Sequence, residues 1–264
     1  MTNTHQTPDT RPLIIGHRGA SAIAPENTLA AFKQALSAGV DGIELDVRLS
    51  REGVPVVIHD ATLRRTGLSS GAVRQLGSKQ LAQIDVGTWF NRAHPKFARD
   101  EYLEERIPTL AQVFDLMRNQ PAIIYVEMKG EHDDATSELA HSVAKLVKSF
   151  NLYDRVVVIS FNLTAIATLK KFDSLIGAGA LFGSTQITSR NWREKILAAT
   201  ADCGANELLL HRLLARRKLL EKAHDAGLPV VVWTVDVADW VERARLLKLH
   251  ALMTNHPAKL LAAR

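Results

Sequence analysis

Short apolar runs rich in β-branched residues alternate with longer amphipathic stretches along almost the whole chain, and this alternation strongly constrains the fold. The runs predict strands at Leu13–Gly16, Gly42–Val47, Pro55–His59, Ile123–Met128, Val156–Ser160, Ile176–Leu181, Asn206–Leu210, Val230–Thr234 and Ala251–Met253. Between most of them, apolar residues recur at intervals of three and four, as in Leu29, Phe32 and Leu36, which predicts helices with one buried face. Alternating strands and helices indicate β/α units. In a chain of 264 residues they fit a (β/α)8 TIM barrel better than a doubly wound sheet.

One connection departs from this pattern. The segment Ser50–Gly53 has turn chemistry and is too short for a crossover helix, so the second and third strands form a hairpin or connect without a helix, which distorts the barrel there. Residues 60–106 are polar and only weakly periodic, which predicts an insertion after the third strand, at the barrel mouth. We expect a flexible tail at residues 1–10 and a single domain over residues 11–264.

Composition excludes several classes of protein. The single cysteine, Cys203, excludes an internal disulfide and a cysteine zinc cluster. No apolar run is long enough to span a membrane, and residues 1–10 contain no apolar signal segment, so we expect a cytoplasmic location. The net charge of +5 is compatible with nucleic acid, a membrane surface or an anionic substrate. The densest basic stretch, residues 211–220, has leucines at helical spacing and resembles a solvated helix face, so we expect neither nucleic-acid binding nor a stable membrane anchor.

Charged residues gather at the predicted strand ends, where TIM barrels carry their active sites. They are His17, Arg18, Glu44, Asp46, His59, Asp60, Glu127 and Lys129. Side chains alternate across a strand, so Glu44 and Asp46 share one face while Leu45 faces the helices. By the same rule Glu127 shares a face with Lys129. The sequence therefore predicts one cluster of charged groups inside the barrel mouth.

The carboxylates of Glu44, Asp46 and Glu127 would repel one another and lose hydration inside a barrel unless a cation compensates them. A bound divalent metal is the simplest remedy, and all-oxygen ligation suits Mg²⁺ or Ca²⁺ rather than zinc. The alternative for any one carboxylate is an ion pair with a nearby arginine or with Lys129. The combination of so many charged groups at strand ends favours the metal site.

Arg18 and Lys129 stay cationic at neutral pH, and together with a metal they would bind a tetrahedral anion such as a phosphate. His17 and His59 would then serve as general base and general acid, because an imidazole can be neutral or protonated near neutral pH. Cleavage of a phosphodiester needs such a pair, since one group activates the nucleophile and the other protonates the leaving alkoxide.

These residues lie in a set of motifs that resembles the glycerophosphodiester phosphodiesterase family. The motifs are His17-Arg18-Gly19, Pro25-Glu26-Asn27-Thr28, Glu44-Leu45-Asp46-Val47, His59-Asp60, Glu127-Met128-Lys129, Ser160-Phe161 and Trp233-Thr234-Val235. The resemblance implies a (β/α)8 barrel with a small insertion that hydrolyses deacylated phospholipid diesters to glycerol 3-phosphate and an alcohol, with a divalent metal. It implies that His17 and His59 are the acid/base pair. It also implies a mechanism in which a glycerol hydroxyl attacks phosphorus and water then opens the cyclic phosphate.

The resemblance extends to the metal and substrate contacts. It implies that Glu44, Asp46 and Glu127 are metal ligands and that Arg18 and Lys129 contact the phosphate. It places the aromatic residues Phe161 and Trp233 near the glycerol or head group.

One motif departs from the family's pattern, and another has a structural interpretation. Near the C-terminus, Thr254-Asn255-His256-Pro257 replaces the family's usual Thr-Asp-Tyr-Pro, so Asn255 keeps the shape of the aspartate without its charge. Near the N-terminus, Pro25 and Glu26 suit the first turn of a helix, which favours helix initiation as their role.

Two other functions use the same residues. A lysophospholipase D-like phosphodiesterase would use the same histidines and metal, but it needs an apolar surface for lipid chains, and no amphipathic anchor stands out. A non-catalytic phosphate- or lipid-binding barrel would need only Arg18, Lys129 and the metal, so the acid/base pair disfavours it. The sequence leaves open the head-group alcohol, the choice between Mg²⁺ and Ca²⁺, and the oligomeric state.

Overall fold

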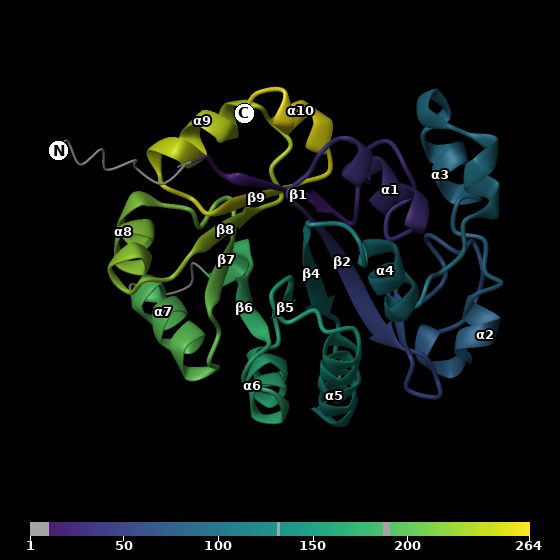
Figure 1. Ribbon diagram of the computed structural model, residues 1–264, viewed down its shortest axis with the longest axis horizontal. Helices are drawn as coiled ribbons and strands as arrows, with labels where there is room; N and C mark the ends of the chain where they lie inside the picture. The colour runs from purple at the N-terminus through teal and green to yellow at the C-terminus, as the bar shows by residue number, and fades with distance from the viewer. Residues whose placement is uncertain (1–10, 131–132, 187–190) are drawn as a thin grey trace.

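A computed structural model describes residues 11–130, 133–186 and 191–264, and in it eight parallel strands close into a barrel (Figure 1). The barrel strands are β1 (Leu13–His17), β2 (Gly42–Leu49), β4 (Ile123–Met128), β5 (Val156–Ser160), β6 (Gly177–Phe182), β7 (Glu207–His211), β8 (Val230–Trp233) and β9 (Ala251–Thr254). Pairing of β1 with both β9 and β2 closes the ring. The predicted (β/α)8 barrel is confirmed, and each strand end lies within two residues of the predicted one.

Alternate side chains of the strands face two apolar layers, as the twofold periodicity of a strand requires. The inner layer fills the barrel and consists of Ile15, Tyr125, Ile159, Leu181, Leu209, Val231, Ala251 and Met253. The outer layer lies between the strands and the helices; it includes Ile14, Leu45 and Met128. Because Leu45 and Met128 face outward, the neighbouring residues on β2 and β4 face the barrel interior.

Helices between the strands cover the outside of the barrel (Figure 1). They are α1 (Leu29–Ser37), α4 (Leu110–Met117), α5 (Asp133–Ser149), α6 (Leu163–Phe172), α7 (Trp192–Asp202), α8 (Arg217–Asp225), α9 (Asp239–Leu246) and α10 (Pro257–Leu261). N-cap side chains mark where several helices begin. At α1 the Thr28 side chain accepts a hydrogen bond from the Ala31 amide, and at α6 the Asn162 side chain accepts one from the Thr164 amide. In the described part of the chain, no helix has the length and apolarity needed to cross a bilayer.

The exception predicted between the second and third strands is a hairpin. β3 (Pro55–Val57) pairs antiparallel with the end of β2, so it lies beside the barrel and is not one of its eight parallel strands. The segment between β3 and α4 contains only short helices: η1 (Val73–Gln75), α2 (Ser78–Leu81), α3 (Thr88–Ala93), η2 (Pro95–Phe97) and η3 (Asp100–Glu104). Figure 1 shows α2 and α3 at one side of the barrel, beyond α1 and α4. This segment has an apolar cluster of its own that includes Leu63 and Leu81.

A buried acid lies inside the barrel at the amino end of β7. The Tyr125 hydroxyl donates a hydrogen bond to Glu207 Oε2 at 3.0 Å, and burial raises the pKa of Glu207 to about 7. The unfolded chain has an ordinary glutamate pKa, so between that value and about 7 the folded protein binds more protons than the unfolded one. Its free energy of unfolding therefore falls as pH rises through this window.

We expect Glu207→Gln to remove this pH dependence, because glutamine keeps the shape and is never charged. The variant should exceed the wild type in free energy of unfolding by roughly 1–3 kcal/mol at pH 8, since each unit of pKa shift corresponds to about 1.4 kcal/mol. Near pH 5 the two should be almost equal. Urea unfolding of both proteins at the two pH values tests this, and an equal difference at both would contradict it.

Candidate active site

His17 is the last residue of β1, and a hydrogen bond fixes the proton on its ring. Asn255 Nδ2 donates to Asp236 Oδ2 at 2.8 Å, which turns Asn255 Oδ1 toward His17 Nδ1 at 2.7 Å. Because Oδ1 can only accept, Nδ1 must carry the proton. His17 Nε2 then faces the barrel mouth, 3.9 Å from Glu44 Oε2. Burial and the neighbouring Arg18 lower the pKa of His17 to about 4, so the ring is neutral at neutral pH.

His59 follows β3 and has a different partner. Its Nδ1 donates to Asp60 Oδ1 at 2.6 Å, so Nε2 is again the ring nitrogen left for a ligand. Burial lowers the pKa of His59, while the negative charges of Asp46 and Asp60 oppose that shift. The two imidazoles therefore differ in the acceptor of their Nδ1 hydrogen bond, which is a neutral amide for His17 and a carboxylate for His59.

Arg18 lies in a tight turn after β1. Both Arg18 and Gly19 have left-handed φ angles, 55° and 81°. A Cβ at residue 19 would lie 2.6 Å from the Ala31 carbonyl carbon, so the turn requires glycine there. The Arg18 amide donates to Glu44 Oε2 at 2.9 Å, and its guanidinium Nε lies 3.1 Å from Asp46 Oδ2. The turn thus brings a cation to the edge of the acidic cluster.

Lys129 directly follows β4 and is the second cation of the site. Its Nζ lies 2.5 Å from Glu127 Oε1 and 3.1 Å from Asp46 Oδ1. The side chains of Arg18 and Lys129 are 18% and 14% exposed, so both are mostly removed from water yet open to the cavity. Two cations at the mouth of one pocket suit a bound phosphate.

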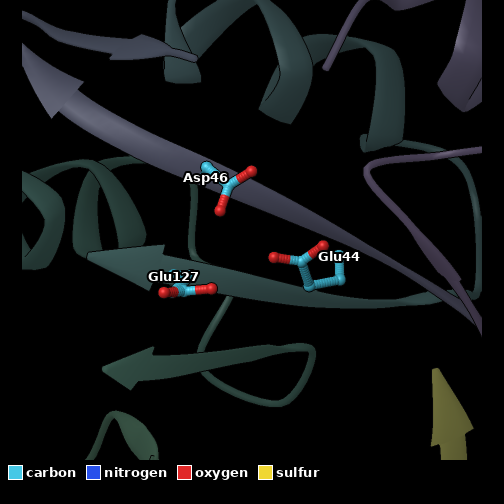
Figure 2. Close-up of side chains that lie close together, drawn as sticks. All are labelled: Glu44, Asp46 and Glu127. Carbon is cyan, nitrogen blue, oxygen red and sulfur yellow. The ribbon is translucent and has the colours of Figure 1, made fainter. Parts of the chain in front are cut away.

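Glu44 and Asp46 from β2 and Glu127 from β4 point their carboxylates into one space (Figure 2). One oxygen of each lies within 4.8 Å of the others, and all three residues are buried. Burial, and then the charge of Asp46, raise the pKa of Glu127 to about 7 and that of Glu44 well above its usual value. Burial acts the same way on Asp46, but Arg18 and Lys129 outweigh it and hold its pKa below the usual value. Three ionised carboxylates would exceed the charge of the two cations, so without a further cation the site favours protonated Glu44 and Glu127.

The three carboxylates fit a divalent metal ion. Apart from ion-pair contacts with Lys129, three of their oxygens have no hydrogen-bond partner among the described residues: Glu44 Oε1, Asp46 Oδ1 and Glu127 Oε1. Buried carboxylate oxygens without donors are costly. A hard cation with oxygen ligands would contact all three and stabilise the ionised form of each carboxylate.

Two aromatic side chains line the same cavity. Phe161 follows β5 and Trp233 ends β8; their ring centroids lie 5.4 Å apart, edge to face. Phe161 is 46% exposed, and Lys129 Nζ lies 5.8 Å from its ring centroid. The aromatic pair gives one side of the cavity an apolar wall beside the cations.

The predicted site residues lie together. A cavity of about 220 Å³ is lined by His17, Arg18, Glu44, His59, Glu127, Lys129, Ile159, Phe161, Leu181, Trp233 and Met253. Asp46 lies beneath it, completely buried, and contacts Arg18 and Lys129. The arrangement combines a pocket with two cations, a carboxylate triad and two imidazoles, each with Nε2 free of a protein hydrogen bond among the described residues.

The helix-initiation role predicted for Pro25 and Glu26 is wrong. α1 begins at Leu29, with Thr28 as its N-cap, so these residues precede the helix in a turn. Glu26 Oε1 accepts from Arg18 Nη1 at 2.9 Å, and Glu26 therefore orients a site residue. Proline near a helix start is common, and the composition of the motif alone did not reveal this contact.

Sequence reasoning also missed residues that hold the site in place. Asn27 Nδ2 donates to Asp46 Oδ2 at 2.7 Å, and Asn27 Oδ1 accepts from the Asp46 amide. Asp236 lies behind Asn255 and supplies a negative charge next to that neutral amide. Asn27 lies within the motif of residues 25–28, which was a usable signal, whereas nothing in the sequence singles out Asp236.

Comparison with known proteins gives one family. The model of the glycerophosphoryl diester phosphodiesterase family matches residues 17–259. A glycerophosphodiester phosphodiesterase of Caldanaerobacter subterraneus subsp. tengcongensis is 30% identical over 251 residues, which cover 95% of this chain and 97% of that protein.

Solved structures that resemble this chain belong to the same class of enzyme. A phosphodiesterase of Oleispira antarctica, solved in complex with the product sn-glycerol-3-phosphate, superposes with a TM-score of 0.83 at 26% identity and covers 96% of each chain. A glycerophosphodiester phosphodiesterase of Agrobacterium tumefaciens gives a TM-score of 0.76 at 28% identity, covering 95% of this chain and 99% of that one. The chain therefore belongs to the glycerophosphoryl diester phosphodiesterase family and is an enzyme of that class.

Proposed function

We propose that this enzyme hydrolyses glycerophosphodiesters such as glycerophosphocholine and glycerophosphoethanolamine to sn-glycerol 3-phosphate and an alcohol. The observation that carries the proposal is the placement of two imidazoles, each with Nδ1 held by an acceptor, around a cavity that also contains two cations. The phosphodiesterase of Oleispira antarctica, which has the same fold, was solved with sn-glycerol-3-phosphate as its product.

Arg18 and Lys129 would bind the two non-bridging oxygens of the phosphodiester. Both cations are already oriented by carboxylates, so little side-chain freedom is lost when substrate binds. Phe161 and Trp233 would pack against the carbon atoms of the glycerol or of the head group. Together these contacts would fix phosphorus between the two imidazoles.

The two imidazoles would then move one proton each. His17 Nε2 accepts the proton of a glycerol hydroxyl as that oxygen bonds to phosphorus, and the bond from phosphorus to the leaving oxygen breaks. His59 gives its Nε2 proton to the leaving alkoxide, because the carboxylate of Asp60 behind it stabilises the imidazolium form. Hydrolysis of the cyclic phosphate reverses the proton transfers, with water as the nucleophile.

Glu44, Asp46 and Glu127 would hold one divalent ion, and either Mg²⁺ or Ca²⁺ suits their oxygen ligands. When bound, the ion would supply positive charge that favours the ionised hydroxyl and the phosphate. The single domain over residues 11–264, the cytoplasmic location and the absence of nucleic-acid and membrane partners stay predictions.

The direct test is release of sn-glycerol 3-phosphate from glycerophosphocholine by the purified enzyme, with Mg²⁺ or Ca²⁺ in the buffer. We expect release that depends on enzyme concentration, and comparable release from glycerophosphoethanolamine. Lysophosphatidylcholine is the competing substrate. If it is cleaved and glycerophosphocholine is not, the lysophospholipase D-like function replaces this proposal, and a folded enzyme without activity on any of the three contradicts both.

A further inference from the structure

Arg65, in the segment after β3, contacts two carboxylates at once. Its Nη1 and Nη2 donate to Glu26 Oε2 and Oε1 at 2.7 and 2.8 Å. Its Nε and Nη2 donate to Asp60 Oδ2 and Oδ1 at 2.8 and 3.0 Å. The planar guanidinium therefore forms a two-pronged contact with each carboxylate, which a lysine ammonium group cannot reproduce.

Each of these carboxylates also holds one residue of the proposed catalytic site. Glu26 Oε1 accepts from Arg18 Nη1, and Asp60 Oδ1 accepts from His59 Nδ1. Arg65 does not line the cavity that contains Arg18 and His59. Glu26 and Asp60 are therefore the contacts that connect Arg65 to Arg18 and His59.

The rest of the environment favours an ordered Arg65. Its guanidinium carbon lies 5.7 Å from the ring centroid of Trp89 in α3, so the inserted segment packs over it. The Glu26 side chain is only 12% exposed. Burial alone would raise the pKa of Glu26, but hydrogen bonds from Arg65 and the charge of Arg18 outweigh it and lower the pKa. Glu26 thus stays ionised between its two arginines.

We propose that Arg65 is a positioning residue that sets the orientation of both the phosphate-binding Arg18 and the leaving-group acid His59. This inference rests on the proposed function. Its consequence is specific: Arg65 links the inserted segment to binding, through Glu26, and to protonation of the leaving group, through Asp60. A residue that merely anchored the segment would lack that second effect.

The test compares two substrates with the same glycerol phosphate and different leaving groups. Choline is a poor leaving group and needs a proton from His59, whereas 4-nitrophenolate leaves without one. We expect Arg65→Ala to lower kcat on glycerophosphocholine by about 10- to 100-fold, the usual size of effects from residues that orient a site. On the 4-nitrophenyl ester the single-turnover rate of nitrophenolate release should change by less than about threefold, because His59 would act on that substrate only later, when the cyclic phosphate opens. KM should rise for both substrates through Arg18.

Arg64→Ala is the matched control, because Arg64 is the exposed neighbour in the same segment and does not line the cavity. It should behave as wild type on both substrates. Arg65→Lys keeps the charge but loses the two-pronged contacts with the carboxylates. If Arg65→Ala proves unstable in thermal unfolding, Arg65→Lys should show the same difference between the two substrates. In a His59→Ala background, Arg65→Ala should cause no further loss of kcat on glycerophosphocholine.

The outcomes separate the two proposals. If the wild type cleaves both substrates and the Arg65 variants slow the single-turnover release of both leaving groups equally, the positioning role is wrong and the proposed function stands. Additive losses in the double variant would also overturn it. If the wild type cleaves neither substrate, the proposed function fails, and the role of Arg65 fails with it.

Discussion

Replacing His17 with alanine should lower kcat on glycerophosphocholine by about 100- to 10,000-fold, the range typical for loss of a general base or acid. The physical reason is that Nε2 of His17 would be the proton acceptor, and its neighbours, Asn255 and buried carboxylates, are poorly placed to replace it. KM should change far less, because proton transfer occurs in the transition state. Steady-state release of sn-glycerol 3-phosphate by the metal-loaded variant measures both constants.

His59→Ala should give a loss of similar size on glycerophosphocholine but a much smaller one in the single-turnover release of nitrophenolate from the 4-nitrophenyl ester, since nitrophenolate needs no proton. His17→Ala should lose kcat on both substrates, because both must activate the glycerol hydroxyl. This contrast assigns the roles of base and acid, and the reverse pattern would exchange them. His141→Ala is the control: this exposed histidine of α5 packs against Phe172 and should leave both constants unchanged. Wild-type turnover by His17→Ala would remove His17 from the mechanism.

Much of the barrel could be predicted because its periodicities are local. A strand such as Val156–Ser160 shows its apolar, β-branched character within five residues. The apolar residues on the buried face of a helix recur at intervals of three or four residues. The sequence allows the hairpin between β2 and β3 as one of two connections, because a short turn excludes a helix without fixing the strand pairing. The short helices of residues 73–104 escaped prediction, since segments of three to six residues carry almost no periodic signal.

The clustering of the candidate site residues could be predicted where they coincide with strand ends, whereas contacts between distant segments could not. Glu44, Asp46 and Glu127 could be grouped because parallel strands place equivalent positions side by side. The contact between Asn255 and His17 spans most of the chain, and only the resemblance drew attention to residue 255. The missing charge of Asn255 has a structural counterpart in Asp236, which hydrogen-bonds to that amide, and local sequence reasoning had no means to find it.

Removal of divalent metal should abolish activity, with a decline of about 1,000-fold or more, since metal-supplied charge stabilisation at a phosphate is worth several kcal/mol and each 1.4 kcal/mol is tenfold in rate. Without the ion, the site lacks this positive charge, and each carboxylate of the triad that ionises would repel the phosphodiester. The measurement is turnover after chelation and dialysis, followed by titration with Mg²⁺ or Ca²⁺. Full turnover in chelator would contradict the metal site.

Binding of the ion can be measured separately from turnover. A ligand that binds only the folded state raises the unfolding temperature, so Mg²⁺ or Ca²⁺ should stabilise the chelated wild type against heat. Glu127→Gln removes one ligand charge and should weaken this stabilisation strongly. Glu207→Gln is the matched control, because Glu207 is a mostly buried glutamate of the same barrel, at the opposite end from the triad. Its metal titration should follow that of the wild type, and equal weakening in both variants would show that general loss of negative charge, and not ligation by the triad, sets the affinity.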